Sequence, residues 1–313
     1  MSRVGDGGVP SKARAYAKVN LTLEVLGRRP DGYHEIRTVL QTIGLADTLH
    51  VAPGEGVRLR CSDPDLEGPG NLVCKAAQAL RRESGESRGA DIRLEKLIPV
   101  GMGLGGGSAD AAAALLSLRR LWGLGLDDGR LTDIAAGLGA DVPFLLNGGT
   151  ALGTGRGDRV ELLPPPPTRW MVLVCPAAAH PGQTREQATK TARLYSMMSP
   201  EHYTDGKRTE ALTETLRAGG DTEPLLFNAF EPVALEAFEG LAAAWSALRE
   251  AAEPYAGRPN GSGGPHLSGT GPAMYTFVPG KPEGENVVKT LKCRGVRAYL
   301  VATINPDPHG EGT

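Results

Sequence analysis

The feature that most constrains this chain is a glycine-rich stretch leading directly into an alanine-rich run. Residues 99–116 read PVGMGLGGGSADAAAALL, and five glycines fall within the seven positions from Gly101 to Gly107. Glycines let a backbone turn sharply and approach a ligand without a Cβ atom in the way. A helix that begins after such a loop directs free N–H groups and a partial positive charge at it, which favours phosphate. The pattern predicts a phosphate loop, with Ser108 as the helix N-cap and Asp110 in the first turn.

Other kinds of glycine loop fit the sequence less well. A Walker loop is excluded because no lysine follows the glycines. Gly101, Gly103 and Gly106 formally satisfy the dinucleotide pattern, but a turn rather than a β-branched strand follows the helix. The chain also lacks the His-Arg-Asp and Asp-Phe-Gly motifs of protein kinases. A flexible surface loop without a ligand remains the simple alternative.

Composition excludes several classes of protein. The 34 Lys and Arg residues balance 36 Asp and Glu residues, so a basic surface for nucleic acid is not expected. No apolar run reaches the roughly 18 residues of a membrane helix, and the N-terminus lacks the apolar stretch of a signal peptide. The four cysteines are scattered without a CxxC pair, which favours a reducing cytoplasm over disulfides or zinc. We expect a cytoplasmic protein with a small-molecule substrate, and the sequence leaves its oligomeric state open.

Helices and strands mix without regular βαβ alternation, so the 313 residues predict an α+β fold with two domains. Four consecutive prolines at 164–167 form a stiff segment and mark a boundary between residues 13–163 and residues 168–306. The first dozen residues are expected to be disordered. Strands are predicted at 15–26, 39–45, 48–51, 57–61, 91–97, 150–151, 159–163, 170–175 and 296–303, and helices at 71–82, 108–122, 130–138, 189–198, 210–217 and 229–253.

The form Pro-x-Gly-x-Gly-Leu-Gly-Gly-Gly-Ser-Ala resembles the phosphate loop of the GHMP small-molecule kinases. Three further stretches match the family in its own order: AKVNL at 17–21 with RPDGYH at 29–34, GADVPF at 139–144, and SGTGP at 268–272. Together they are similar to the branch that phosphorylates a cytidyl-bearing alcohol in the non-mevalonate route to isoprenoid precursors. The resemblance implies a ribosomal S5-like N-terminal domain, a ferredoxin-like C-terminal domain and an active site between them.

The resemblance also implies that ATP is the co-substrate and that the glycine loop binds it. Mg²⁺ is expected to bind through the ATP phosphates, and no acidic metal ligand from the protein is evident in the sequence. The implied ATP-binding residues are Pro99, Val100, Gly101, Met102, Gly103, Leu104, Gly105, Gly106, Gly107, Ser108 and Ala109.

By the same resemblance, Asp141 faces the substrate hydroxyl, and Lys18 lies beside it near the γ-phosphate. A lysine next to an aspartate keeps the carboxylate ionised and can offset charge on the transferring group. The residues alone permit simpler interpretations. Asp141 precedes Pro143 and suits a helix N-cap, while Lys18 could be a strand lysine that faces water.

The resemblance implies some substrate contacts by matching motifs and others by matching spacing alone. Asn20, Tyr33 and His34 match positions that hold the cytidyl substrate, although Tyr33 and His34 also suit an ordinary edge strand. Thr191 and Tyr195 have the spacing of a family threonine and an aromatic that packs on the cytosine. A segment that reads as an insertion, His180 to Lys190, precedes them, and plain helix packing is the alternative for Tyr195. Further implied substrate-binding residues are Gly269, Thr270 and Gly271.

The expected function is therefore ATP-dependent phosphorylation of a hydroxyl on a cytidyl-bearing alcohol. A GHMP kinase for homoserine, mevalonate or a sugar is the alternative within enzymes, and the motif at 31–34 argues against it. A non-catalytic nucleotide-binding sensor is the alternative outside enzymes. The presence of both Lys18 and Asp141 argues against a sensor, because a chain that had lost catalysis could lose either.

Overall fold

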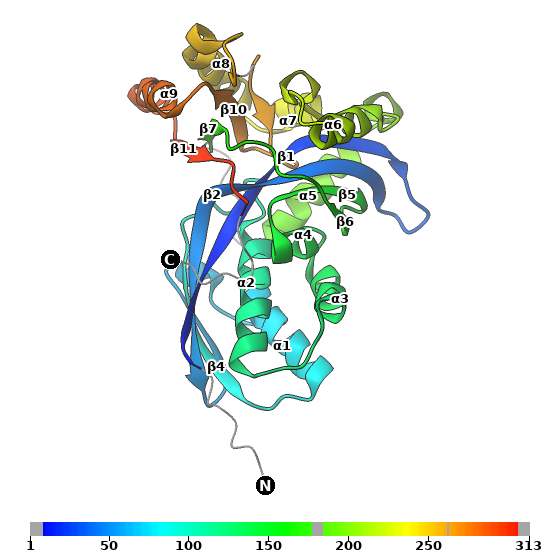
Figure 1. Cartoon of the computed structure of the whole chain (residues 1–313), viewed down its shortest axis with the longest axis vertical. Helices are drawn as coiled ribbons and strands as arrows, with labels where there is room; N and C mark the ends of the chain where they lie inside the picture. The colour runs from blue at the N-terminus through cyan, green and yellow to red at the C-terminus, as the bar shows by residue number, and fades with distance from the viewer. Residues whose placement is uncertain (1–8, 177–183, 262, 306–313) are drawn as a thin grey trace.

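The structure, a computed structural model, describes residues 9–176, 184–261 and 263–305. Within these ranges the chain forms two β-sheets with helices packed on them (Figure 1). Disorder is expected for the first dozen residues, and residues 1–8 lie outside the described ranges. The expectation is wrong for residues 11 and 12, because β1 begins at Ser11. Part of the predicted insertion, residues 180–183, also lies outside it. None of the described helices is long and apolar enough to cross a membrane.

A long antiparallel hairpin of β1 (Ser11–Arg28) and β2 (His34–Gly54) is the centre of the first sheet. β2 is continuous where the sequence predicts two strands, because the buried Asp47 carboxylate is satisfied inside the fold. It accepts a hydrogen bond from the backbone N–H of Ile98 at 2.8 Å. The sheet order is β3-β4-β2-β1-β8, with β5 paired to β2 and β6 to β5. The remaining strands are β3 (Val57–Cys61), β4 (Gly89–Glu95), β5 (Thr150–Gly155), β6 (Arg159–Leu162) and β8 (Phe227–Asn228).

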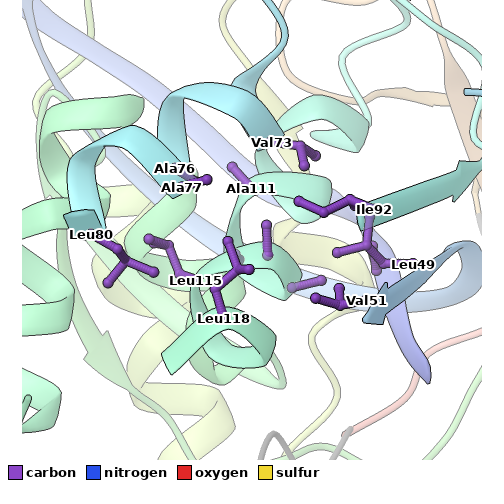
Figure 2. Packing of buried hydrophobic residues seen from close by; sticks show 14 of the residues in the cluster. Leu49, Val51, Val73, Ala76, Ala77, Leu80, Ile92, Ala111, Leu115 and Leu118 are labelled. Carbon is purple, nitrogen blue, oxygen red and sulfur yellow. The ribbon is translucent and has the colours of Figure 1, made fainter. Parts of the chain in front are cut away.

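Four helices pack with the first sheet: α1 (Leu72–Ser84), α2 (Gly106–Leu121), α3 (Asp128–Leu138) and α4 (Val142–Asn147). Their core combines small and large apolar side chains. Figure 2 shows Ala76 and Leu80 of α1 beside Leu115 of α2, with Leu49 of β2 and Ile92 of β4 next to them. Alanines let α1 and α2 approach closely, so the alanine-rich run after the glycines is a buried helix that fixes the position of the loop before it.

The second sheet is antiparallel in the order β11-β7-β10-β9. Its strands are β7 (Trp170–Val174), β9 (His266–Leu267), β10 (Met274–Val278) and β11 (Ala298–Ala302). The helices of this half are α5 (Thr184–Met197), α6 (Lys207–Arg217), α7 (Glu231–Ala237), α8 (Leu241–Ala252) and α9 (Lys281–Cys293). The single helix predicted at 229–253 is wrong, because the chain leaves helical geometry at Phe238 and divides the tract into α7 and α8.

Segments from both halves of the chain meet along β1 and β2. The proline segment 164–167 joins β6 to β7, yet β8 pairs in parallel with β1, and Thr303 forms a bridge with Ile43. A third apolar cluster combines Val19 of β1 and Leu173 of β7 with residues of the loop before α2. The boundary between residues 13–163 and 168–306 stays a prediction, and these pairings place elements of the second half on the first sheet.

Candidate active site

Lys18 lies where β1 departs from regular strand geometry. The pairing of β1 with β2 shifts register between Tyr16 and Lys18, and the Lys18 backbone N–H instead donates to the carbonyl oxygen of Leu104 at 2.9 Å. A bulge of this kind re-aims a side chain and here ties the strand to the glycine loop. The Lys18 side chain is only 3% exposed, which contradicts the interpretation as a water-facing strand lysine.

The ammonium group of Lys18 has two polar partners. Its Nζ donates to Asn20 Oδ1 at 2.8 Å and lies 3.5 Å from Asp141 Oδ2. Asp141 directly precedes α4, at the N-cap position, but its side chain makes no capping hydrogen bond. The carboxylate is about one-third exposed. A cap is therefore not its role, and the arrangement is an ion pair with a buried lysine and a carboxylate that solvent or a ligand can reach.

The phosphate loop, residues 99–105, ends where α2 begins. α2 starts at Gly106 with Gly105 as its N-cap, so the prediction that Ser108 is the N-cap is wrong. Ser108 is the third residue of the helix, and no side chain caps its first turn. The helix N-terminus consequently keeps free N–H groups and its partial positive charge near Lys18.

The loop docks on a turn from the other half of the chain, residues 268–271. Gly103 has a φ of +82°, and a Cβ atom there would overlap the Ser268 carbonyl oxygen. Ser268 Oγ in turn donates to the Gly103 carbonyl at 3.0 Å. The Gly269 N–H donates to Asn20 Oδ1 at 2.9 Å, and Thr270 is almost fully buried. The phosphate loop, the 268–271 turn and the Lys18 side chain thus lie against one another.

The predicted ATP-binding stretch divides into two environments. Met102 and Leu104 are buried in the apolar cluster between the sheets, and Ala109 is buried under α1. The others are partly or fully exposed: Pro99, Val100, Gly101, Gly103, Gly105, Gly106, Gly107 and Ser108. Three side chains therefore anchor the loop, and its glycines present backbone to a ligand.

A buried ion cluster that sequence reasoning missed holds the two ends of the phosphate loop. Lys96 Nζ donates to Asp110 Oδ2 at 2.7 Å and to Asp47 Oδ2. Asp110 is therefore a partner of Lys96, and its predicted place in the first turn is wrong because α2 begins at Gly106. Burial raises the pKa of Asp110 to about 7. The Lys96 ammonium opposes this rise, and the negative charge of Asp47 adds to it. The sequence signal for this cluster was a lysine and an aspartate, 14 residues apart, on either side of the glycine loop.

The other predicted substrate residues are distributed around the start of β2. His34 stacks on Tyr195 of α5, with ring centroids 4.8 Å apart and planes inclined by 27°. Tyr203, which sequence reasoning missed, places its hydroxyl 3.4 Å from His34 Nε2. Burial and then the Arg28 charge lower the pKa of His34, so the imidazole is neutral at pH 7. The fold therefore brings His34 and Tyr195 together despite their distance in sequence, and Thr191 lies exposed one turn earlier in α5.

Tyr33 has a different environment from its neighbour His34. Tyr33 is 57% exposed, and the Arg156 guanidinium lies 5.0 Å from its ring centroid. Arg156 comes from the turn between β5 and β6 and is held by Asp158 at 2.7 Å. Asn20 likewise differs from the simple expectation of a substrate ligand. Its side chain accepts from Lys18 and Gly269 and donates to Thr38 Oγ1 at 2.7 Å.

Metal-ligating side chains do not gather at this site. Among the described residues, no group of three or more His, Cys, Asp or Glu side chains is arranged to hold a metal ion. The Ser108 hydroxyl lies in the first turn of α2, beside the open end of the helix.

Comparisons with known proteins identify the family. The profile described as "GHMP kinases N terminal domain" matches residues 71–149. A Dehalococcoides mccartyi protein named 4-diphosphocytidyl-2-C-methyl-D-erythritol kinase is 39% identical over 293 residues, which is 93% of this chain and 98% of that protein. A relative of the same name from Pelotomaculum thermopropionicum is 38% identical over 299 residues, with 94% and 98% covered.

A solved structure gives the same result. The crystal structure of a 4-(cytidine 5'-diphospho)-2C-methyl-D-erythritol kinase is 34% identical, has a TM-score of 0.76, and covers 93% of this chain and 98% of its own. The predicted α+β GHMP kinase fold is thereby confirmed. The chain belongs to the 4-diphosphocytidyl-2-C-methyl-D-erythritol kinase family of the GHMP kinases.

Proposed function

We propose that this chain transfers the γ-phosphoryl group of ATP to the 2-hydroxyl of 4-diphosphocytidyl-2-C-methyl-D-erythritol, a step towards isoprenoid precursors. The observation that carries the proposal is the Lys18–Asp141 pair, 3.5 Å apart, beside two glycine turns from different halves of the chain. Phosphoryl transfer needs mainly positioning and charge stabilisation, and this pair supplies both signs of charge at the loop.

In the proposed reaction the substrate hydroxyl oxygen attacks the γ-phosphorus. The bond from that phosphorus to the bridging oxygen of ADP breaks, and the hydroxyl proton passes to the Asp141 carboxylate. Lys18 offsets charge on the transferring group, and Asn20 holds the ammonium in place through its 2.8 Å contact. Mg²⁺ bound to the ATP phosphates would neutralise part of their charge. ATP would lie along the backbone of the phosphate loop and the start of α2.

We further propose that the cytidyl group binds near the start of β2. The stacked His34 and Tyr195 and the exposed ring of Tyr33 support this, because aromatic faces and a base-directed hydrogen bond suit a pyrimidine. The other proposed contacts with the substrate are Asn20, Thr191, Gly269, Thr270 and Gly271. A kinase for homoserine, mevalonate or a sugar would not need such rings. Four free cysteines fit a cytoplasmic setting.

The product tests the proposal. Incubation of the purified chain with ATP, Mg²⁺ and the cytidyl alcohol should give one new phosphomonoester at the 2-hydroxyl, seen by phosphorus NMR and mass spectrometry. Asp133→Asn is the matched control for the Asp141→Asn variant, because Asp133 is an exposed carboxylate of α3. Phosphorylation at another hydroxyl, or no product from a folded protein, would contradict the proposed function.

A further inference from the structure

A second lysine lies against both glycine turns. Lys190 is in the first half of α5, and its Nζ donates to the carbonyl oxygens of Gly101 and of Gly271, the latter at 2.6 Å. The same ammonium lies 5.7 Å from the centroid of the Phe238 ring. One cation therefore joins the phosphate loop of the N-terminal half to the 268–271 turn of the C-terminal half.

Lys190 has no counter-charge among the residues whose side chains the structure describes, 9–176, 190–261 and 263–305. Both of its hydrogen-bond partners within these ranges are neutral carbonyls, and no carboxylate there forms an ion pair with it. Within those ranges, the groups found around the ammonium are backbone carbonyls of the two turns, the Phe238 ring, and Lys18 of β1, whose own carboxylate partner is Asp141. Burial above all, and then the Lys18 charge, lower the pKa of Lys190 to about 8. A half-buried cation beside a like charge is costly unless an anion completes the site.

We propose that Lys190 is a phosphate-binding residue of this site: its ammonium joins the two glycine turns and offsets the charge of a bound polyphosphate. The inference rests on the proposed kinase function for its ligand, and it adds a cation that the paired Lys18 cannot supply alone. Both candidate ligands, ATP and the diphosphate of the cytidyl substrate, share polyphosphate chemistry. Lys190 contacts Gly101 in the phosphate loop and Gly271 in the other glycine turn, so the experiment measures the binding of both ligands.

Charge and hydrogen bonding can be separated by substitution. Lys190→Gln keeps N–H donors for the two carbonyls but removes the charge, and Lys190→Arg keeps the charge. Arg193→Gln is the matched control, because Arg193 is an exposed cation on the same helix. Calorimetry with a non-hydrolysable ATP analogue and, separately, with CDP shows which ligand Lys190 contacts.

We expect Lys190→Gln to weaken at least one of these ligands about tenfold or more, the scale of a charged hydrogen bond. Lys190→Arg should bind within a few-fold of the wild type, and Arg193→Gln should bind as the wild type does. A folded Lys190→Gln variant that binds both ligands like the wild type would overturn the proposal. Thermal unfolding establishes that each variant is folded.

Proton uptake gives a readout that a structural role would not move, and comparison of the wild type with Lys190→Gln assigns it to Lys190. A bound polyphosphate raises the pKa of Lys190, so at pH 8.5 the wild type should take up a fraction of a proton on binding. Calorimetry in two buffers of different ionisation enthalpy measures it. Uptake that persists unchanged in Lys190→Gln overturns the proposal. Binding that depends on Lys190, without turnover of the cytidyl alcohol, overturns only the proposed substrate.

Discussion

Lys18 shows what sequence can and cannot predict at a single residue. The motif AKVNL identifies the lysine and the asparagine, but strand alternation alone allows Lys18 to face water. The β-bulge between Tyr16 and Lys18 and the contact with Leu104 turn it inward, and that contact joins residues 86 positions apart in the sequence. Asn20 is similarly predicted to contact the substrate, and nothing in the sequence indicated that its side chain also hydrogen-bonds to Lys18, Gly269 and Thr38. Long-range partners of this kind leave no local signal.

Asp141→Asn should lower kcat by at least about 10²-fold, the scale of losing one group that acts in the transition state. The variant should fold with a lowered melting temperature, because the substitution removes the carboxylate partner of the buried Lys18 ammonium but no capping hydrogen bond. Steady-state rates and thermal unfolding of this variant and of Asp133→Asn check the prediction. A kcat within a few-fold of the wild type would show that Asp141 has no part in the transfer.

Tyr33→Ala and His34→Ala should each raise the KM for the cytidyl alcohol about tenfold or more. Stacking and a base-directed hydrogen bond are each worth roughly 1–3 kcal/mol in nucleic-acid recognition. The KM for ATP should stay within about twofold. Tyr195→Ala should behave in the same way if its ring, stacked on His34, also contacts the cytosine. Equal changes in both KM values would mean that these residues act through folding.

At the scale of elements, the glycine loop and the helix after it were predictable, but their junction was not. The alternation of glycine and apolar residues marks the loop, and the alanine run marks α2. The helix nevertheless begins at Gly106 because the buried cluster of Lys96, Asp47 and Asp110 fixes both ends of the loop. Hence Ser108 lies inside the helix, and Gly106 has helical rather than left-handed backbone geometry.

Gly103→Ala is the sharpest test of the loop. Its φ of +82° disfavours any other residue, and a Cβ would overlap the Ser268 carbonyl. We expect calorimetry to show a loss of affinity for an ATP analogue of at least about tenfold. Gly123→Ala is the control, because Gly123 also has a positive φ, +57°, but no neighbour within 4 Å of the added Cβ. Equal effects of the two substitutions would attribute the loss to backbone strain alone.

The buried cluster predicts a pH-dependent difference in stability. The folded-state pKa of Asp110, about 7, lies above the usual 3.8, so its protonated form favours folding. That contribution is full below about pH 4 and is lost as pH rises through about 7. Asp110→Asn cannot titrate. Its melting temperature relative to the wild type should therefore rise by at least about 2 °C between pH 5 and pH 8. A difference that stays constant with pH would contradict this assignment.

At the scale of the whole molecule, the motifs mark the segments that meet at Lys18, whereas periodicity missed several of the elements. Helix α9 was not predicted, because Val287, Val288 and Leu291 give it a narrow apolar stripe among polar residues. β8 is only two residues long and gains its partner, β1, from the other half of the chain. The meeting of two glycine turns at Lys18 was implied by the family resemblance alone, since nothing local in either turn specifies the other.

The central claim is that this meeting point selects a cytidyl alcohol for phosphorylation. The most direct measurement is the initial rate of ADP release by the purified chain with 4-diphosphocytidyl-2-C-methyl-D-erythritol, homoserine and mevalonate, each with ATP and Mg²⁺. We predict a kcat/KM for the cytidyl alcohol at least about 10³-fold above the other two, because a site built for a base leaves its polar groups unpaired with smaller alcohols. A kcat/KM for homoserine or mevalonate equal to or above that value would contradict the account.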